Sequence, residues 1–161
     1  MQSLATNPSF WSALFAWLAA QLIKMSDHYI HTRKVDISYL VSTGGMPSAH
    51  SAMVCGLTTS VGIRAGMDSP LFAVTLAFAL VVMFDAQSVR RAAGQQARVL
   101  NQLIEQLFKE HQLNVQKLGE LLGHTRKEVA IGMMLGIVVA LLVHAICNSP
   151  LVNHIPPILA P

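Results

Sequence analysis

Two histidines stand in short segments whose side chains could carry out chemistry together. His50 lies in the stretch GGMPSAHSA, two residues after Ser48, and His124 opens the stretch HTRKE. Because an unperturbed imidazole has a pKa of about 6.5, one ring can act as a nucleophile while the other donates a proton. Glu128 follows His124 by four residues, and on a helix this spacing brings the carboxylate to the same face, where it can orient the ring. The pattern predicts His124 as nucleophile, His50 as general acid and Glu128 as the group that positions His124.

The residues just before His50 suit the binding of an anion. Gly44 and Gly45 allow the chain to turn tightly with its amides exposed, and Pro47 fits the first turn of a helix, where the N–H group that it lacks would have no partner. A helix that begins here points free N–H groups and the positive end of its dipole at one place. Ser48 could add a hydroxyl hydrogen bond. We therefore expect a phosphate group to bind at this turn.

Three basic residues could complete the phosphate site. Arg90 or Arg91 could contact two phosphate oxygens at once, and Lys24 could add a further positive charge. Asp85, just before the arginine pair, is expected to support them. Arginines and helix ends can stabilise the developing charge without a metal, so we expect neither a metal nor another cofactor. The chemistry that these side chains suit is phosphoryl transfer.

Each of these residues also has an explanation that involves no chemistry. A histidine at a helix start can cap the helix, Glu128 can complement the helix dipole, and Arg90 and Arg91 can mark the end of a membrane helix. A metal site is a separate alternative, because the stretch DHYIH places two histidines three residues apart, although interfacial histidines explain that spacing as well. The side chains available to such a site are Asp27, His28, His31, Asp36, His50, Asp85 and His124.

The elements that must position these residues are strongly apolar. Hydrophobic residues make up 53% of the 161 residues and charged residues only 12%, whereas a typical soluble domain is about one quarter charged. Residues 4–23, 69–84 and 129–147 form stretches that could span or nearly span a bilayer. Residues 47–63 are weakly apolar and rich in small residues, which suits the middle of a bundle. We predict an all-α integral membrane bundle of about four helices, with residues 1–161 as a single domain.

A further helix is expected in the connection 92–123 between the third and fourth membrane helices. Val99, Leu100, Leu103 and Ile104 recur there at helical spacing, with polar residues between them. We predict an amphipathic helix that lies on the membrane surface or over the mouth of the bundle.

Most of the basic residues fall on one side of this bundle. Of the eleven Lys and Arg residues, three lie between the first and second helices, one between the second and third, and seven between the third and fourth. By the positive-inside rule, the first and third connections are cytoplasmic and both termini lie outside. The candidate residues then gather on the cytoplasmic face. We expect the membrane and a phosphorylated lipid as partners, and no nucleic acid. Whether the chain forms a homo-oligomer stays open at this point.

Three segments of the chain resemble a known group of proteins. The segments TGGMPSAHSA, FDAQSVRRAAGQQA and LGHTRKEVAIGMMLG are similar to the divergent branch of the type-2 phosphatidic acid phosphatase superfamily. The wider superfamily includes lipid phosphate phosphatases, bacterial acid phosphatases and vanadium-dependent haloperoxidases. The resemblance extends from about Ala20 to about Leu142 and therefore covers most of the chain.

The resemblance implies roles for particular residues. It implies phosphate contact by Ser48, general acid work by His50, and a nucleophilic His124 followed by its acid, Glu128, where the family usually has Asp. Ala49 stands where the family motif has Gly. The implied activity is hydrolysis of a phosphate ester or diphosphate of a lipid through a phosphohistidine. The alternative is a non-catalytic membrane protein that binds anionic lipid or phosphate.

Overall fold

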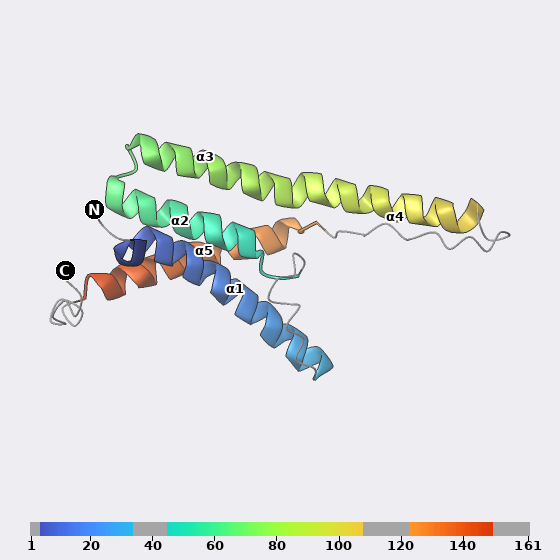
Figure 1. Cartoon of the computed structure of the whole chain (residues 1–161), viewed down its shortest axis with the longest axis horizontal. Helices are drawn as coiled ribbons and strands as arrows, with labels where there is room; N and C mark the ends of the chain where they lie inside the picture. Colours follow the sequence, from blue (N-terminus) through green and yellow to red (C-terminus); the bar gives the residue numbers. More distant parts are fainter. Residues whose placement is uncertain (1–3, 34–44, 108–122, 150–161) are drawn as a thin grey trace.

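The structure, a computed structural model, describes residues 4–33, 45–107 and 123–149, and within these ranges every regular element is a helix (Figure 1). The predicted all-α architecture is confirmed. In chain order the elements are η1 (Leu4–Thr6), α1 (Pro8–Thr32), α2 (Ala49–Ala65), α3 (Pro70–Phe84), the π-helical turn η3 (Asp85–Val89), α4 (Arg90–Leu107) and α5 (Arg126–Cys147).

Polar residues fix where the helices of the bundle begin. Asn7, Ser48, Ser69 and Thr125 each accept a backbone hydrogen bond from the first turn of the helix that follows, which satisfies an N–H group that would otherwise have no partner. In α1 and α3 a proline follows the cap at the start of the helix, where its missing N–H group costs nothing.

The helix α2 lies in the middle of the bundle, in contact with α1, α3 and α5. Small residues bring it close to two of these neighbours. A Cβ atom at Gly136 of α5 would overlap the carbonyl oxygen of Ala52, and one at Gly56 would come within 3.1 Å of the Cβ of Ala16 in α1. Helices in membranes pack closely through such small residues. The middle position predicted for the small-residue segment is confirmed.

Hydrogen bonds between buried side chains join α1, α2 and α5 near the start of α1 and the end of α5. The Ser60 hydroxyl donates to Ser9 Oγ over 2.9 Å and lies 2.7 Å from His144 Nε2. Hydrogen bonds of this kind between membrane helices contribute about 0.6 to 2 kcal/mol each. The three side chains therefore help to set how α1, α2 and α5 align along their axes.

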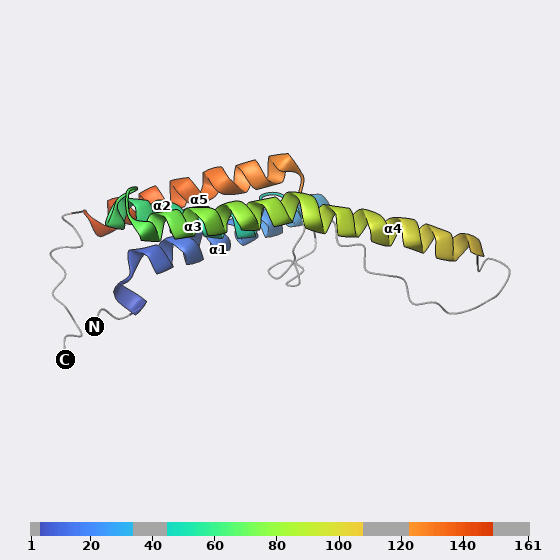
Figure 2. The ribbon, with the colours of Figure 1, turned by 90° about the horizontal axis from the view of Figure 1, so that it is seen from above.

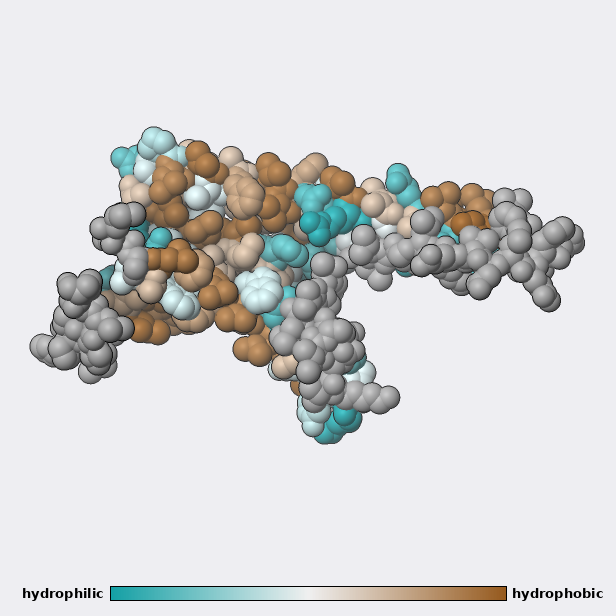
Figure 3. All heavy atoms as spheres, in the orientation of Figure 1, coloured by the Kyte–Doolittle hydropathy of each residue, from teal (hydrophilic) through white to brown (hydrophobic). Residues whose placement is uncertain are grey.

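The outer surface of α3 is apolar. Leu71, Val74, Phe78, Val81 and Phe84 are each more than half exposed, and hydrophobic side chains cover much of the face of the bundle seen in Figure 3. The continuous helix Pro70–Glu105 and the helix Arg126–Cys147 are long and apolar enough to cross a membrane. This surface suits contact with lipid.

The helix α1 extends well beyond the apolar stretch 4–23. It continues through the DHYIH segment and ends at Thr32, where Arg33 adopts a left-handed conformation with φ 56°. That segment was expected to lie between helices. The chain contains no proline or glycine from Ser9 to Thr43, so local sequence does not stop the helix where its apolar stretch ends.

The predicted amphipathic helix is a continuation of α3 and not a separate element. The third membrane helix was expected to end at Asp85 and the arginine pair, but η3 carries the chain into α4 without a break. No proline occurs between Pro70 and Leu107 to interrupt the helix. In both views α4 runs on in line with α3 and points away from the bundle, so it does not cover the bundle mouth (Figures 1 and 2).

Candidate active site

The candidate site lies at the end of the bundle where α2 and α5 begin and α3 passes into η3 (Figure 1). Two backbone hydrogen bonds tie these elements together. The Ser48 N–H donates to the Glu128 carbonyl over 3.1 Å, and the His124 N–H donates to the Ala86 carbonyl over 3.0 Å. The start of α5 is therefore fixed both to the start of α2 and to η3.

His124 and Glu128 form the closest side-chain pair of the site. His124 Nδ1 lies 2.8 Å from Glu128 Oε2, and the histidine is almost completely buried. A carboxylate at Nδ1 favours the tautomer with its hydrogen there, since Nδ1 can then donate. The other ring nitrogen, Nε2, keeps a lone pair that could attack an electrophile.

The four-residue spacing predicts that both side chains lie on one face of a helix. In the structure the pair instead forms across the start of the helix. His124 precedes the capping residue Thr125, and Glu128 reaches back from the third helical position. Thr125 Oγ1 accepts from the Glu128 N–H, and Glu128 Oε2 accepts from the Thr125 N–H, each over 3.3 Å. This capping box holds the carboxylate beside His124. The sequence Thr-x-x-Glu at a helix start is its readable signature.

Ser48 is fully buried and caps α2. Its Oγ accepts a hydrogen bond from the Ser51 hydroxyl over 2.9 Å and a longer one from the Ser51 N–H over 3.4 Å. Because the Ser48 oxygen acts as the acceptor in both, its own hydroxyl hydrogen is left to donate. The sequence did not single out Ser51, although it occupies the position from which a residue commonly bonds a helix cap. Ala49, where the family motif has Gly, packs among small core residues that include Ala20.

Lys24 enters the site from α1 and is 4% exposed. It lies within electrostatic range of both Glu128 and His50. An ammonium group is costly to bury without an opposite charge, so the carboxylate of Glu128 helps to keep it there. Gly45 packs beside the lysine, since a Cβ atom would come within 3.5 Å of Lys24 Cδ, and its φ of +83° favours glycine. Gly44 lies outside the described residues.

His50, in the first turn of α2, is surrounded by ionisable side chains from several elements. Arg90, His124, Lys24 and Asp85 all act on its ring electrostatically. Arg90 Nε donates to Asp85 Oδ2 over 2.7 Å. Asp85 therefore orients the Arg90 guanidinium, whose charge acts on His50.

Arg91 is placed differently from its neighbour. Its side chain is exposed, and it is not among the charges that act on His50. Its backbone instead packs against Gly123, where a Cβ atom would overlap the Arg91 nitrogen. The charge of Arg90, but not that of Arg91, thus acts on His50. The close approach at Gly123 lets His124 reach η3.

The π-helical turn itself had no recognisable signal in the sequence. A π-helical segment inside an α-helix is rare and is frequently found at functional sites. Here the Ala86 carbonyl of the turn accepts the hydrogen bond from the His124 N–H. Asp85 and Gln87 are the neighbours of Ala86 in the same turn. Residue types between 85 and 89 do not distinguish such a turn from ordinary helix.

The residues of the alternative metal site do not form a metal-binding group within the described ranges. Asp27 and His31 form an exposed pair on α1, with 3.6 Å between His31 Nδ1 and Asp27 Oδ1, and Asp36 lies outside those ranges. Within residues 4–33, 45–107 and 123–149, no three His, Cys, Asp or Glu side chains come together as a metal site would require.

Comparison with known proteins identifies the family to which the chain belongs. The Divergent PAP2 family matches residues 5–139. The chain is 45% identical over 152 residues to the uncharacterized membrane protein YuiD of Bacillus subtilis (strain 168), a match that covers 86% of this chain and 94% of that protein. No solved structure matches the chain. The chain therefore belongs to the Divergent PAP2 family and is a membrane phosphatase-like protein.

Proposed function

We propose that this protein hydrolyses a phosphate ester or diphosphate of a membrane lipid through a phosphohistidine at His124. The observation that carries the proposal is the 2.8 Å contact between His124 Nδ1 and Glu128 Oε2, which leaves Nε2 available as a nucleophile. The surrounding His50, Lys24 and Arg90 supply a proton donor and positive charge. Membership of the Divergent PAP2 family supports the phosphatase chemistry.

In the first half-reaction, His124 Nε2 attacks phosphorus and the bond between phosphorus and the leaving oxygen breaks. Protonated His50 gives its proton to that oxygen, so an ester substrate loses a neutral alcohol. Glu128 accepts the hydrogen bond from Nδ1 and stabilises the positive charge that develops on the ring. The products of this step are the leaving group, phosphohistidine and neutral His50.

In the second half-reaction, a water oxygen attacks phosphorus while neutral His50 takes a proton from the water. The phosphorus–nitrogen bond breaks, which restores His124 and releases inorganic phosphate. Lys24 and Arg90 stabilise the charge on the phosphate oxygens in both steps. The Ser48 hydroxyl and the N-terminus of α2 add hydrogen bonds to those oxygens.

The test is phosphate release from a panel of phosphorylated lipids by the purified full chain. The panel contains phosphatidate, phosphatidylglycerophosphate and a polyprenyl diphosphate. We expect His124→Ala to lower kcat by at least about 1,000-fold, as loss of a nucleophile does, and His50→Ala to lower it by about 100- to 10,000-fold. His31→Ala removes an exposed histidine of α1 and serves as the control with unchanged activity. Full hydrolysis of every lipid by both site variants would show that this mechanism is wrong.

The alternative, a protein that binds anionic lipid or phosphate without turnover, gives a different result. It predicts that phosphorylated lipid raises the melting temperature while no phosphate is released. Vanadate separates the two functions, since a hydrolase should bind this trigonal-bipyramidal mimic far more tightly than phosphate.

A further inference from the structure

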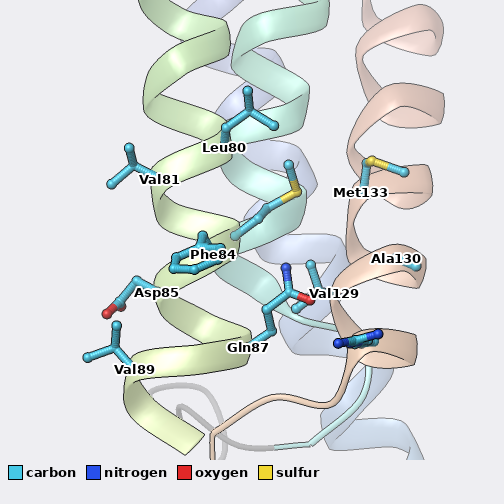
Figure 4. Close-up of a pocket in the computed structure, with 11 residues that line it drawn as sticks. Leu80, Val81, Phe84, Asp85, Gln87, Val89, Val129, Ala130 and Met133 are labelled. Carbon is cyan, nitrogen blue, oxygen red and sulfur yellow. The ribbon is translucent and has the colours of Figure 1, made fainter.

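A groove of about 770 Å³ lies between α3 and α5, next to the candidate active site (Figure 4). Its walls are mainly apolar. Leu80 and Phe84 line it from α3, and Val129 and Met133 line it from α5. Sites for small molecules typically have volumes of about 300 to 1,000 Å³, apolar walls and a few polar groups. The groove fits that description.

The polar groups of the groove connect it to the candidate active site. Asp85, Gln87 and Arg126 line it together with the apolar side chains. Asp85 is the acceptor for Arg90, and the residue between Asp85 and Gln87, Ala86, accepts the backbone hydrogen bond of His124. The turn η3 thus contributes Asp85 and Gln87 to the groove and bonds His124 through the Ala86 carbonyl between them. One end of the groove therefore lies beside Asp85, which the candidate site also contains.

The two walls belong to the helices best suited to face lipid. Among the described residues, the helices Pro70–Glu105 and Arg126–Cys147 are those long and apolar enough to cross a membrane. Leu80 and Val81, on the α3 side, are 56% and 66% exposed. A hydrocarbon chain can therefore enter from the bilayer sideways, without passing through water.

We propose that this groove holds the hydrocarbon tail of the phosphorylated lipid whose phosphate binds at His124, with Arg126 facing the anionic headgroup. The position of the phosphate rests on the proposed function, whereas the groove and its lipid-facing walls do not. Bilayer lipid is as apolar as the groove, so moving a tail from one to the other yields little affinity. The groove instead restricts the orientation of the lipid, and the basic side chains supply the attraction to its phosphate.

The test maps where a lipid tail lies on the full chain in lipid nanodiscs. The probe is a phosphatidate with a photoreactive diazirine in one acyl chain, and cross-linked peptides are identified by mass spectrometry. We expect cross-links on the groove-lining parts of α3 and α5. Ala130→Trp, which fills the groove from an exposed position, should lower their yield about tenfold, because the tail can then no longer lie between the two helices. Ile131→Trp is the matched control, because Ile131 is exposed on the same helix but does not line the groove.

Two further measurements make the outcome decisive. Leu80→Trp fills the groove from the α3 side and repeats the test if Ala130→Trp melts below the wild type. Excess unlabelled phosphatidate should compete with the probe, and diacylglycerol, which has the tails without the phosphate, should compete weakly. Cross-links spread evenly over the lipid-facing surface, and unaffected by either tryptophan, would overturn the proposal. Groove cross-links without phosphate release would support the groove proposal and contradict the hydrolytic function. Hydrolysis with dispersed cross-links would support the hydrolytic function and contradict the groove proposal.

Discussion

At the scale of single residues, Glu128 has two tasks that the structure combines in one side chain. Its carboxylate completes the capping box of α5 and contacts the His124 ring. The four-residue spacing could predict that the two side chains meet. It could not predict that His124 lies outside the helix, because that depends on Thr125 acting as the cap.

The charge of Glu128 can be separated from its capping role. Glu128→Gln keeps the volume and an oxygen that can accept from the Thr125 N–H, but it removes the negative charge that stabilises a positive His124 ring. We expect kcat for phosphorylated lipid to fall about 100- to 10,000-fold. The melting temperature should fall as well, because the buried Lys24 loses its opposite charge. Glu128→Asp keeps the charge and should retain more activity than Glu128→Gln. Wild-type turnover by Glu128→Gln would show that the carboxylate only caps α5.

At the scale of elements, the site depends on how closely α5 approaches α2. Gly132 and Gly136 lie one helical turn apart on α5, and a Cβ atom at either would overlap α2 backbone, at Ser48 and Ala52 respectively. The same contact surface therefore packs α5 against α2 at Ala52 and positions Ser48, a residue of the candidate site. A Gly-x-x-x-Gly spacing in an apolar segment is a readable sign of such an interface.

Gly136→Ala tests this interface directly. Alanine favours a helix over glycine by up to about 1 kcal/mol. The added methyl group, however, meets backbone atoms of Ala52 and Gly56 that cannot rotate away, and overpacking of this kind costs about 1 to 3 kcal/mol. We expect a net loss of stability, measured as a lower melting temperature of the purified protein. Val138→Leu, at an exposed position of the same helix, is the control and should melt like the wild type. A higher melting temperature for Gly136→Ala would mean that α2 and α5 can separate at little cost.

The helices could be predicted from apolar stretches and their caps, but several of their ends could not. The start of α3 follows from Ser69 and Pro70. The start of α2 was predicted two residues too early, because Pro47, expected in its first turn, precedes the cap Ser48 and the helix begins at Ala49. The extension of α1 to Thr32 and the passage of α3 into α4 could not be predicted from hydrophobicity, since a helix continues through polar residues when no breaker stops it. The convergence of Lys24 on Glu128 depends on the packing of α1 and was likewise beyond local sequence.

At the scale of the whole molecule, the bundle has two different ends. The start of α1, the end of α5 and the link from α2 to α3 lie at one end, and the candidate active site lies at the other (Figure 1). The continuous helix Pro70–Glu105 has 36 residues, which gives it a length of about 54 Å, whereas the hydrocarbon core is about 30 Å thick. If α3 spans the core, α4 extends beyond it on the side of the site. The distribution of basic residues predicts that this side is the cytoplasm.

Thiol labelling in intact cells tests that orientation. The background carries Cys55→Ala and Cys147→Ser, because these are the native cysteines of the chain. Single cysteines are then placed at Leu4, which is 63% exposed at the beginning of η1, and at Gln102, which is exposed on α4. We expect a membrane-impermeant maleimide to label Leu4→Cys in intact cells and Gln102→Cys only after permeabilisation, since the basic connections stay in the cytoplasm. The cysteine-free background should not be labelled in either condition. The reverse pattern would place the candidate active site outside the cell, where it could reach phosphorylated lipids only in the outer leaflet.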